Sequence, residues 1–121
     1  MIYKVSRPPK SLHTSVCLPA SKSISNRLLV IHSLSENSAG IDNLSDSDDT
    51  VLMNQALLSD EQVKNIGHAG TAMRFLTAFY SCREGSVTMT GSDRMKERPI
   101  GPLVDALREL GAEISYAGME G

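Results

Sequence analysis

The chain has 121 residues with 40% hydrophobic and 21% charged residues, and its formal net charge at pH 7 is -2. This length is enough for one small domain with a modest core, and the slightly acidic balance argues against nucleic acid as a partner held by phosphate charge. We find no apolar run typical of a secretory signal and none near the ~20 residues that span a bilayer, so we expect a cytoplasmic protein with no membrane partner.

Strand-like and helix-like segments alternate along the chain. The predicted strands cover residues 2–7, 15–18, 39–44, 62–66, 86–90 and 112–116, and the predicted helices cover residues 22–34, 49–58, 71–81 and 100–110. Helices that alternate with strands in this way pack on sheets. The sequence therefore predicts a layered α/β or α+β fold.

The start of the first predicted helix has an unusual charge. Ser21 is a suitable N-cap, and Lys22, Ser23 and Arg27 follow it with no acid between Ser21 and Arg27. A helix N-terminus carries partial positive charge and usually has acid in its first turn, whereas here two cations add to that charge. Because Arg27 lies on the same helix face as Ser23, one turn later, this segment indicates a binding site for an anion.

The apolar residues of this helix recur with a helical period. They are Ile24, Leu28, Leu29, Val30, Ile31 and Leu34. Together they form a wide stripe, and a wide apolar stripe is typical of a helix with several neighbours. We therefore expect this helix to be mostly buried.

An acidic run, residues 45–50 (SDSDDT), precedes the second predicted helix. Ser and Asp suit helix caps and first turns, and the run lacks the glycine and the closing glutamate of a calcium loop. Cys17 and Cys82 lie far apart and have no metal-ligand spacing around them. We therefore expect no metal site, and we expect both cysteines to be reduced and buried.

Two later helix starts carry a glycine loop or several cations. Residues 67–74 (GHAGTAMR) place two glycines three residues apart, where the backbone can approach a ligand closely. Residues 94–98 (RMKER) place three cations in five residues before another helix. Arg94 and Lys96 are equally well explained as solvated loop residues. Three such helix starts in one small domain indicate a shared anion site.

Taken together, these motifs resemble the 5-enolpyruvylshikimate-3-phosphate synthase family. The family's three signatures are matched, in order and at about the family's spacing, by residues 18–27 (LPASKSISNR), 67–74 and 91–100 (GSDRMKERPI). The resemblance covers the whole chain. It implies transfer of the enolpyruvyl group of phosphoenolpyruvate to the 5-hydroxyl of shikimate 3-phosphate, with release of phosphate. It also implies that no metal and no organic cofactor takes part.

The resemblance assigns roles to individual residues. Shikimate 3-phosphate would be held by Lys22, Ser23 and Arg27. Phosphoenolpyruvate would be held by Lys22, Gly70 and Arg98, and Lys22 would be the catalytic residue.

Two further residues near the glycine loop, His68 and Thr71, are additional candidates for the site. The chain departs from the family at His68, where Asn is most frequent, and at Phe75, where Pro is most frequent. Both departures fall in the expected phosphoenolpyruvate pocket, where the family's competitive inhibitor glyphosate also binds.

The family's enzymes are far longer than this chain and have two similar domains built from repeated βαβαββ units. By this resemblance, residues 1–18 would supply strands that pair with the second domain, and residues 19–121 would form part of the N-terminal domain. The general acid/base residues would lie in the part absent here, so we expect the fragment to show no measurable turnover. The full-length enzyme would be a monomer, and exposed apolar surface on the fragment would favour self-association.

Two alternatives stay open. The sister enzyme that transfers enolpyruvate to UDP-N-acetylglucosamine shares fold and chemistry, but its first motif usually has Lys-Asn where this chain has Lys22 and Ser23. A stand-alone anion-binding module without catalysis is the second alternative. A module would bind one anion alone, whereas the enzyme would take phosphoenolpyruvate and shikimate 3-phosphate together.

Overall fold

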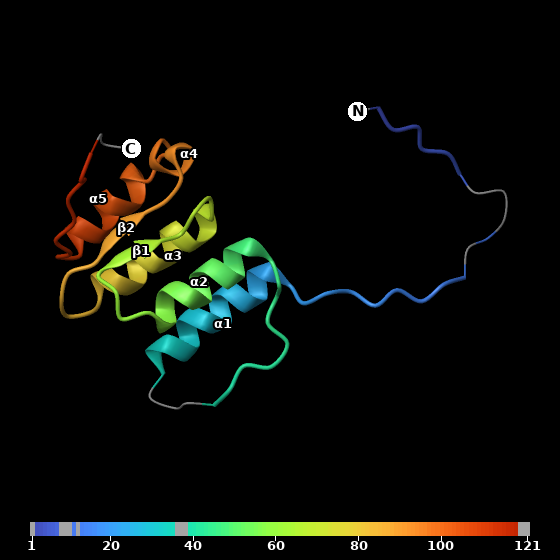
Figure 1. Cartoon of the computed structure of the whole chain (residues 1–121), viewed down its shortest axis with the longest axis horizontal. Coiled ribbons are helices and arrows are strands. Elements are labelled where there is room, and N and C mark those ends of the chain that lie inside the picture. The colour runs from blue at the N-terminus through green and yellow to red at the C-terminus, as the bar shows by residue number, and fades with distance from the viewer. Residues whose placement is uncertain (1, 8–10, 12, 36–38, 119–121) are drawn as a thin grey trace.

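The computed structural model describes residues 2–7, 11, 13–35 and 39–118, and most of its regular structure is helical (Figure 1). The elements are, in chain order, α1 (Lys22–Leu34), α2 (Asp48–Leu58), β1 (Val63–Asn65), α3 (Gly70–Ser81), β2 (Thr88–Thr90), α4 (Asp93–Lys96) and α5 (Gly101–Glu109). The four predicted helices are confirmed to within one or two residues at each end. The short helix α4 is an addition, formed within the cation-rich segment that was expected to be a loop.

The two strands pair in parallel. Val63 lies opposite Thr88, Lys64 opposite Met89, and Asn65 opposite Thr90. Helix α3 connects them, because parallel neighbours need a long crossover rather than a tight turn. Backbone hydrogen bonds continue the pairing past the strand ends, from Ile66 N–H to Thr90 O at 2.9 Å and from Ser92 N–H to Gly67 O at 2.8 Å. This β1–α3–β2 unit places the segment after β2 beside the glycine loop.

The hydrophobic core lies among α1, α2, α3 and the residue that follows β1. Its buried members are Leu29, Met53, Ala56, Ile66, Ala69, Ala72 and Leu76. The helices α1 and α2 contact each other, and α2 also contacts α3. Figure 1 shows these three helices side by side, with their N-terminal ends at the same end of the body.

Four predicted strands are absent from the described chain, namely 2–7, 15–18, 39–44 and 112–116. For residues 2–7 and 15–18 the physical reason is that a strand needs a neighbour to accept and donate its backbone hydrogen bonds. In Figure 1 the described N-terminal residues run away from the helices, where no such neighbour lies. The layered fold with helices and a small parallel sheet is confirmed in this coarse form.

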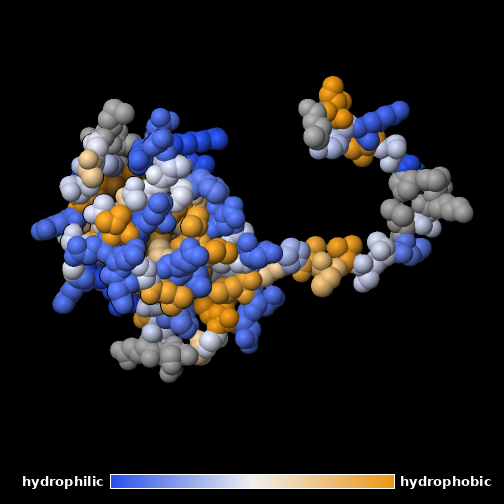
Figure 2. Space-filling model, in the orientation of Figure 1, coloured by the Kyte–Doolittle hydropathy of each residue, from blue (hydrophilic) through white to orange (hydrophobic). Residues whose placement is uncertain are grey.

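The expected burial of α1 is wrong for most of its apolar stripe. Ile24, Leu28, Ile31 and Leu34 are exposed, whereas Leu29 is buried together with the polar residues Ser25 and Asn26. Helices α2 and α3 cover one side of α1, and the described chain supplies nothing to cover the other side. Figure 2 shows apolar side chains gathered at the surface of the body in the region of α1.

The expected burial of the two cysteines is also wrong. Cys17 and Cys82 are free thiols, and both are exposed. Cys17 lies in the extended N-terminal part, and Cys82 is the residue that caps the C-terminal end of α3. No helix in the described parts of the chain has the length and apolar character needed to cross a membrane.

Candidate functional site

The first helix begins as the sequence predicts. The Ser21 side-chain oxygen accepts a hydrogen bond from Ile24 N–H at 3.4 Å, and Ser21 has an extended backbone (φ -75°, ψ 120°). The first turn of α1 contains no acidic residue. Lys22 and Ser23 are exposed at this end of the helix, where the free N–H groups carry partial positive charge.

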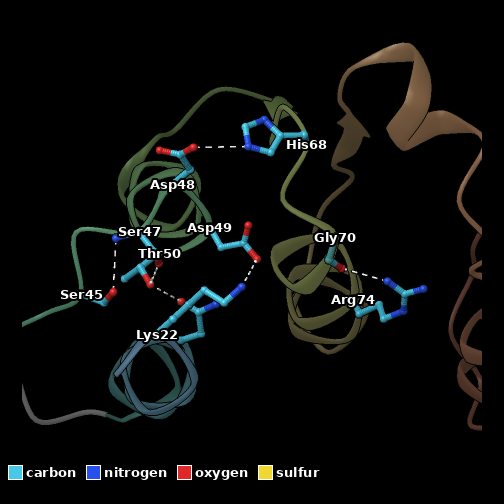
Figure 3. Close-up of polar contacts among 10 residues, drawn as sticks. Lys22, Ser45, Ser47, Asp48, Asp49, Thr50, His68, Gly70 and Arg74 are labelled. Carbon is cyan, nitrogen blue, oxygen red and sulfur yellow. Dashed lines mark hydrogen bonds and ion pairs between the residues drawn. The ribbon is translucent and has the colours of Figure 1, made fainter. Parts of the chain in front are cut away.

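The first turn of α1 has no acidic residue, and Lys22 pairs instead with an acid of α2. The Lys22 Nζ lies 3.3 Å from Asp49 Oδ1, and Asp49 is in the first turn of α2 (Figure 3). The acidic run therefore has a second role besides its favourable position at the start of α2. It also holds the lysine at the start of α1. Sequence reasoning missed this contact, because the two residues are 27 positions apart.

Buried hydrogen bonds fix α1 against the segment that leads into α2. Ser25 Oγ accepts from Ser45 N–H at 2.9 Å, and Thr50 Oγ1 donates to Asn26 Oδ1 at 2.7 Å. Asn26 is fully buried, and its Nδ2 has no partner among the described residues. These buried bonds are directional, so they fix how α1 is rotated about its axis and where it lies along that axis relative to α2. Lys22, Ser23 and Arg27 take their positions from this arrangement.

Arg27 connects α1 to α3. Its Nη1 donates to Ser23 O at 2.9 Å, and its guanidinium carbon lies 5.6 Å from the centre of the Phe75 ring. This is within the range of a cation–π contact. Phe75 is one of the two departures from the family's usual residues, and here it packs beside a predicted binding residue.

The glycine loop, residues 67–74, contacts the first turn of α2. Gly67 has a positive φ of 54°, a conformation that favours glycine, and Asn65 Oδ1 accepts from Gly67 N–H at 3.0 Å. The next residue, His68, has its Nε2 3.4 Å from Asp48 Oδ2 (Figure 3). Thr71 follows in the first turn of α3 and is half-buried.

Gly70 and Arg98 lie against each other. A Cβ atom added to Gly70 would collide with Nη1 of Arg98, so no other side chain fits at position 70 unless the arginine moves. The Arg98 guanidinium has no hydrogen bond or ion pair with any residue in the described part of the chain. An unpaired guanidinium packed beside the N-terminus of α3 is suited to bind an anion.

A surface pocket of about 220 Å³ lies next to this pair. It is lined by His68, Ser92, Arg94, Met95 and Arg98. The structure distinguishes Arg94 from Lys96, which the sequence could not tell apart. Arg94 lines the pocket, whereas Lys96 pairs with Asp93 on the same helix at 3.2 Å.

Two ion pairs at the start of α2 and one shared pocket bring several of the predicted site residues near one another. Lys22 contacts Asp49, the adjacent Asp48 contacts His68, and His68 lines the same pocket as Arg98. The residues come from α1, from the loop before α3 and from the segment before α5. The arrangement gathers cations and helix N-termini at one end of the helices (Figure 1), and such groups are suited to bind small acidic molecules.

Comparisons with known proteins point to one family. The family model for EPSP synthase (3-phosphoshikimate 1-carboxyvinyltransferase) matches residues 6–59 and 55–121. A 3-phosphoshikimate 1-carboxyvinyltransferase of Bacteroides fragilis is 54% identical over 93% of this chain and 28% of its own length. Proteins of the same name from Sulfurovum sp. and Shewanella pealeana are 42% and 40% identical over 95% and 94% of this chain, and in each the match covers 33% of the relative. The chain therefore spans about a third or less of the relatives it matches.

Proposed function

This chain belongs to the EPSP synthase family, and on that premise we propose that it forms part of the substrate site of a 3-phosphoshikimate 1-carboxyvinyltransferase. In the proposed reaction the 5-hydroxyl of shikimate 3-phosphate attacks C2 of phosphoenolpyruvate while C3 gains a proton. The hydroxyl loses its proton as the C–O bond forms, and the tetrahedral intermediate then loses inorganic phosphate from C2 and a proton from C3, which restores the double bond. By its resemblance to the family, the proposed reaction uses no metal and no organic cofactor.

The proposed roles divide the site into two parts. Ser23 and Arg27 hold shikimate 3-phosphate, and Gly70 and Arg98 hold the phosphate of phosphoenolpyruvate. Lys22 is proposed to contact both substrates. The contact with Asp49 keeps the Lys22 ammonium extended toward the start of α2 rather than free in solvent.

One observation carries the proposal, the packing of the Arg98 guanidinium against Gly70. A phosphate bound there would receive a backbone N–H from the start of α3 and a charged fork from Arg98. Hydrogen bonds to charged groups contribute roughly 1.5–3 kcal/mol each. Two such bonds to one phosphate would give this site a higher affinity for phosphate than a basic surface without them.

We further propose that this chain alone binds ligand without turnover. It spans 28% of the Bacteroides fragilis relative. The general acid/base residues and the cations for the carboxylate of phosphoenolpyruvate belong, in this proposal, to the remaining length. That remainder also holds the second domain, whose sheet would accept residues 1–18 as strands, and the further βαβαββ units that would complete the domain of residues 19–121. The whole enzyme is proposed to be a cytoplasmic monomer.

Calorimetry with a matched pair of glycine variants tests the proposed function. Shikimate 3-phosphate and phosphoenolpyruvate are titrated separately and together into the wild-type chain, Gly70→Ala and Gly40→Ala. A Cβ at Gly70 displaces Arg98, whereas a Cβ at Gly40 meets no atom within 4 Å. We expect Gly70→Ala to weaken phosphoenolpyruvate binding by about tenfold or more, equivalent to about 1.4 kcal/mol. Gly40→Ala should bind as the wild type does.

The same titrations distinguish the alternatives. Binding of phosphoenolpyruvate that is strengthened by shikimate 3-phosphate supports the enzyme site. Binding of one anion alone, unaffected by the other, would favour an anion-binding module. Equal behaviour of the two glycine variants would contradict the role of Gly70 and Arg98.

A further inference from the structure

Arg74 joins the two segments that carry Gly70 and Arg98. Its Nη1 donates to Gly70 O at 3.1 Å, and its Nη2 donates to Pro99 O at 2.9 Å. The first bond lies within the first turns of α3, as Figure 3 shows. The second reaches across 25 positions of sequence to the residue that directly follows Arg98.

The two acceptors explain why an arginine is needed. A guanidinium presents several N–H donors in a rigid planar fork, so one side chain can hold two carbonyl oxygens at a fixed separation. A lysine has a single flexible ammonium and cannot impose that separation. The bond to Pro99 O restrains the backbone next to Arg98. Because the same guanidinium also bonds Gly70 O, this backbone is held at a fixed distance from the start of α3.

The charges around Gly70 would otherwise push the two arginines apart. Arg74 Nη1 lies 3.6 Å from the position a Gly70 Cβ would take, and Arg98 Nη1 lies closer still. Both guanidinium groups therefore lie near the same glycine, and like charges that lie near each other repel. No carboxylate is paired with either guanidinium among the described residues. The Arg74 guanidinium is held instead by the two carbonyl oxygens, and these bonds add to the backbone bond from Ser92 N–H to Gly67 O that already joins the two segments.

We propose that Arg74 is a positioning residue, which sets the Arg98 guanidinium against the Gly70 amide by bridging Gly70 O and Pro99 O. This inference rests on the proposed function, because it takes Gly70 and Arg98 as the phosphate-binding pair. Arg74 itself is not assigned a contact with substrate. Its effect is on the affinity for phosphoenolpyruvate and not on the affinity for shikimate 3-phosphate.

The test compares Arg74→Lys with Arg83→Lys. Arg83 is a matched control, since its guanidinium also donates to a distant backbone carbonyl, that of Ser33, but near the opposite end of α3. Calorimetry measures the affinity of each variant for phosphoenolpyruvate, for inorganic phosphate and for shikimate 3-phosphate. We expect Arg74→Lys to lose about tenfold in affinity for the first two and less than twofold for the third. Arg83→Lys should change none of the three.

A ligand-free measurement keeps the inference separate from the proposed function. In the wild type and both variants, the NMR signals of the Arg98 Nε–H and the Gly70 amide report where the guanidinium lies. We expect both signals to shift in Arg74→Lys and neither to shift in Arg83→Lys. If the wild-type chain binds neither substrate, the proposed function fails, and these signals still decide the role of Arg74. Unchanged Arg98 and Gly70 signals in Arg74→Lys, or an equal loss of affinity for all three anions, would overturn the inference.

Discussion

The two faces of α1 differ in what covers them. The inward face buries Ser25, Asn26 and Leu29 against α2 and α3, and its hydrogen bonds are made within the chain. The outward face exposes Ile31 with 62% of its surface accessible, and three further apolar residues lie exposed beside it. An apolar stripe therefore indicates that a helix face can be buried, but it does not identify the partner. Buried hydrogen bonds, which are directional, do identify the element that packs against the helix.

Adjacent leucines on α1 give the sharpest test of this comparison. Leu29 is 4% exposed and Leu28 is 41% exposed. We expect Leu29→Ala to lower the free energy of unfolding by about 2–5 kcal/mol, because it leaves a cavity in the core. Leu28→Ala should change it by less than about 0.5 kcal/mol. Urea unfolding followed by circular dichroism measures both, and equal losses would show that the outward face is also packed in solution.

The polar contact between α1 and α2 should have the next largest effect. Asn26→Ala removes the acceptor of the Thr50 hydroxyl in a fully buried position. The Thr50 hydroxyl keeps Ser47 Oγ at 3.0 Å as a partner, so the expected cost is that of one buried hydrogen bond, about 0.5–1.5 kcal/mol. Ser23→Ala, on the exposed side of the same helix turn, is the control and should leave the unfolding free energy within about 0.5 kcal/mol of the wild type. A smaller loss in Asn26→Ala than in the control would contradict this account of α1.

Tyr80 connects α3 to α2 and gives a pH-dependent prediction. Its hydroxyl donates to Ala56 O at 2.8 Å, and burial raises the pKa of Tyr80 above its ordinary value of 10.0. Because the folded chain favours the neutral phenol, the associated stability is fully present below pH 10 and is lost as the pH rises through the folded-state pKa. Tyr80→Phe should lower the unfolding free energy by about 1 kcal/mol near neutral pH. Its further decline above pH 10 should be shallower than that of the wild type. Equal slopes for the two proteins would argue against burial of the hydroxyl.

The outward face of α1 should affect association more than stability. Contiguous exposed apolar residues favour contacts between molecules, so we expect the wild-type chain to associate with itself at high concentration. Ile31→Glu places a charge in the middle of the stripe and should raise the concentration at which association begins, with little change in unfolding free energy. Sedimentation velocity over a range of concentrations measures this. A wild-type chain that stays monomeric throughout would refute the expected association.

The candidate site shows where sequence reasoning reached its limit. The cap at Ser21 follows from local chemistry and is confirmed, and α3 begins at Gly70, one residue from the predicted start. The contacts of Lys22 with Asp49 and of Arg74 with Pro99 could not be predicted, because each joins residues 25 or more positions apart. Nor could the pattern decide between Arg94 and Lys96, since both are exposed cations on one short helix and only their neighbours differ.

The sequence by itself determined the four longer helices and where α1 and α3 begin. These properties depend on residues within one or two helical turns of each other. Only the tertiary structure decided which side of α1 is covered, which expected strands find a partner, and which carboxylates and carbonyls hold the cations in place. Those outcomes depend on neighbours distant along the chain, and an apolar or cationic residue has the same local pattern whether or not such a neighbour is present.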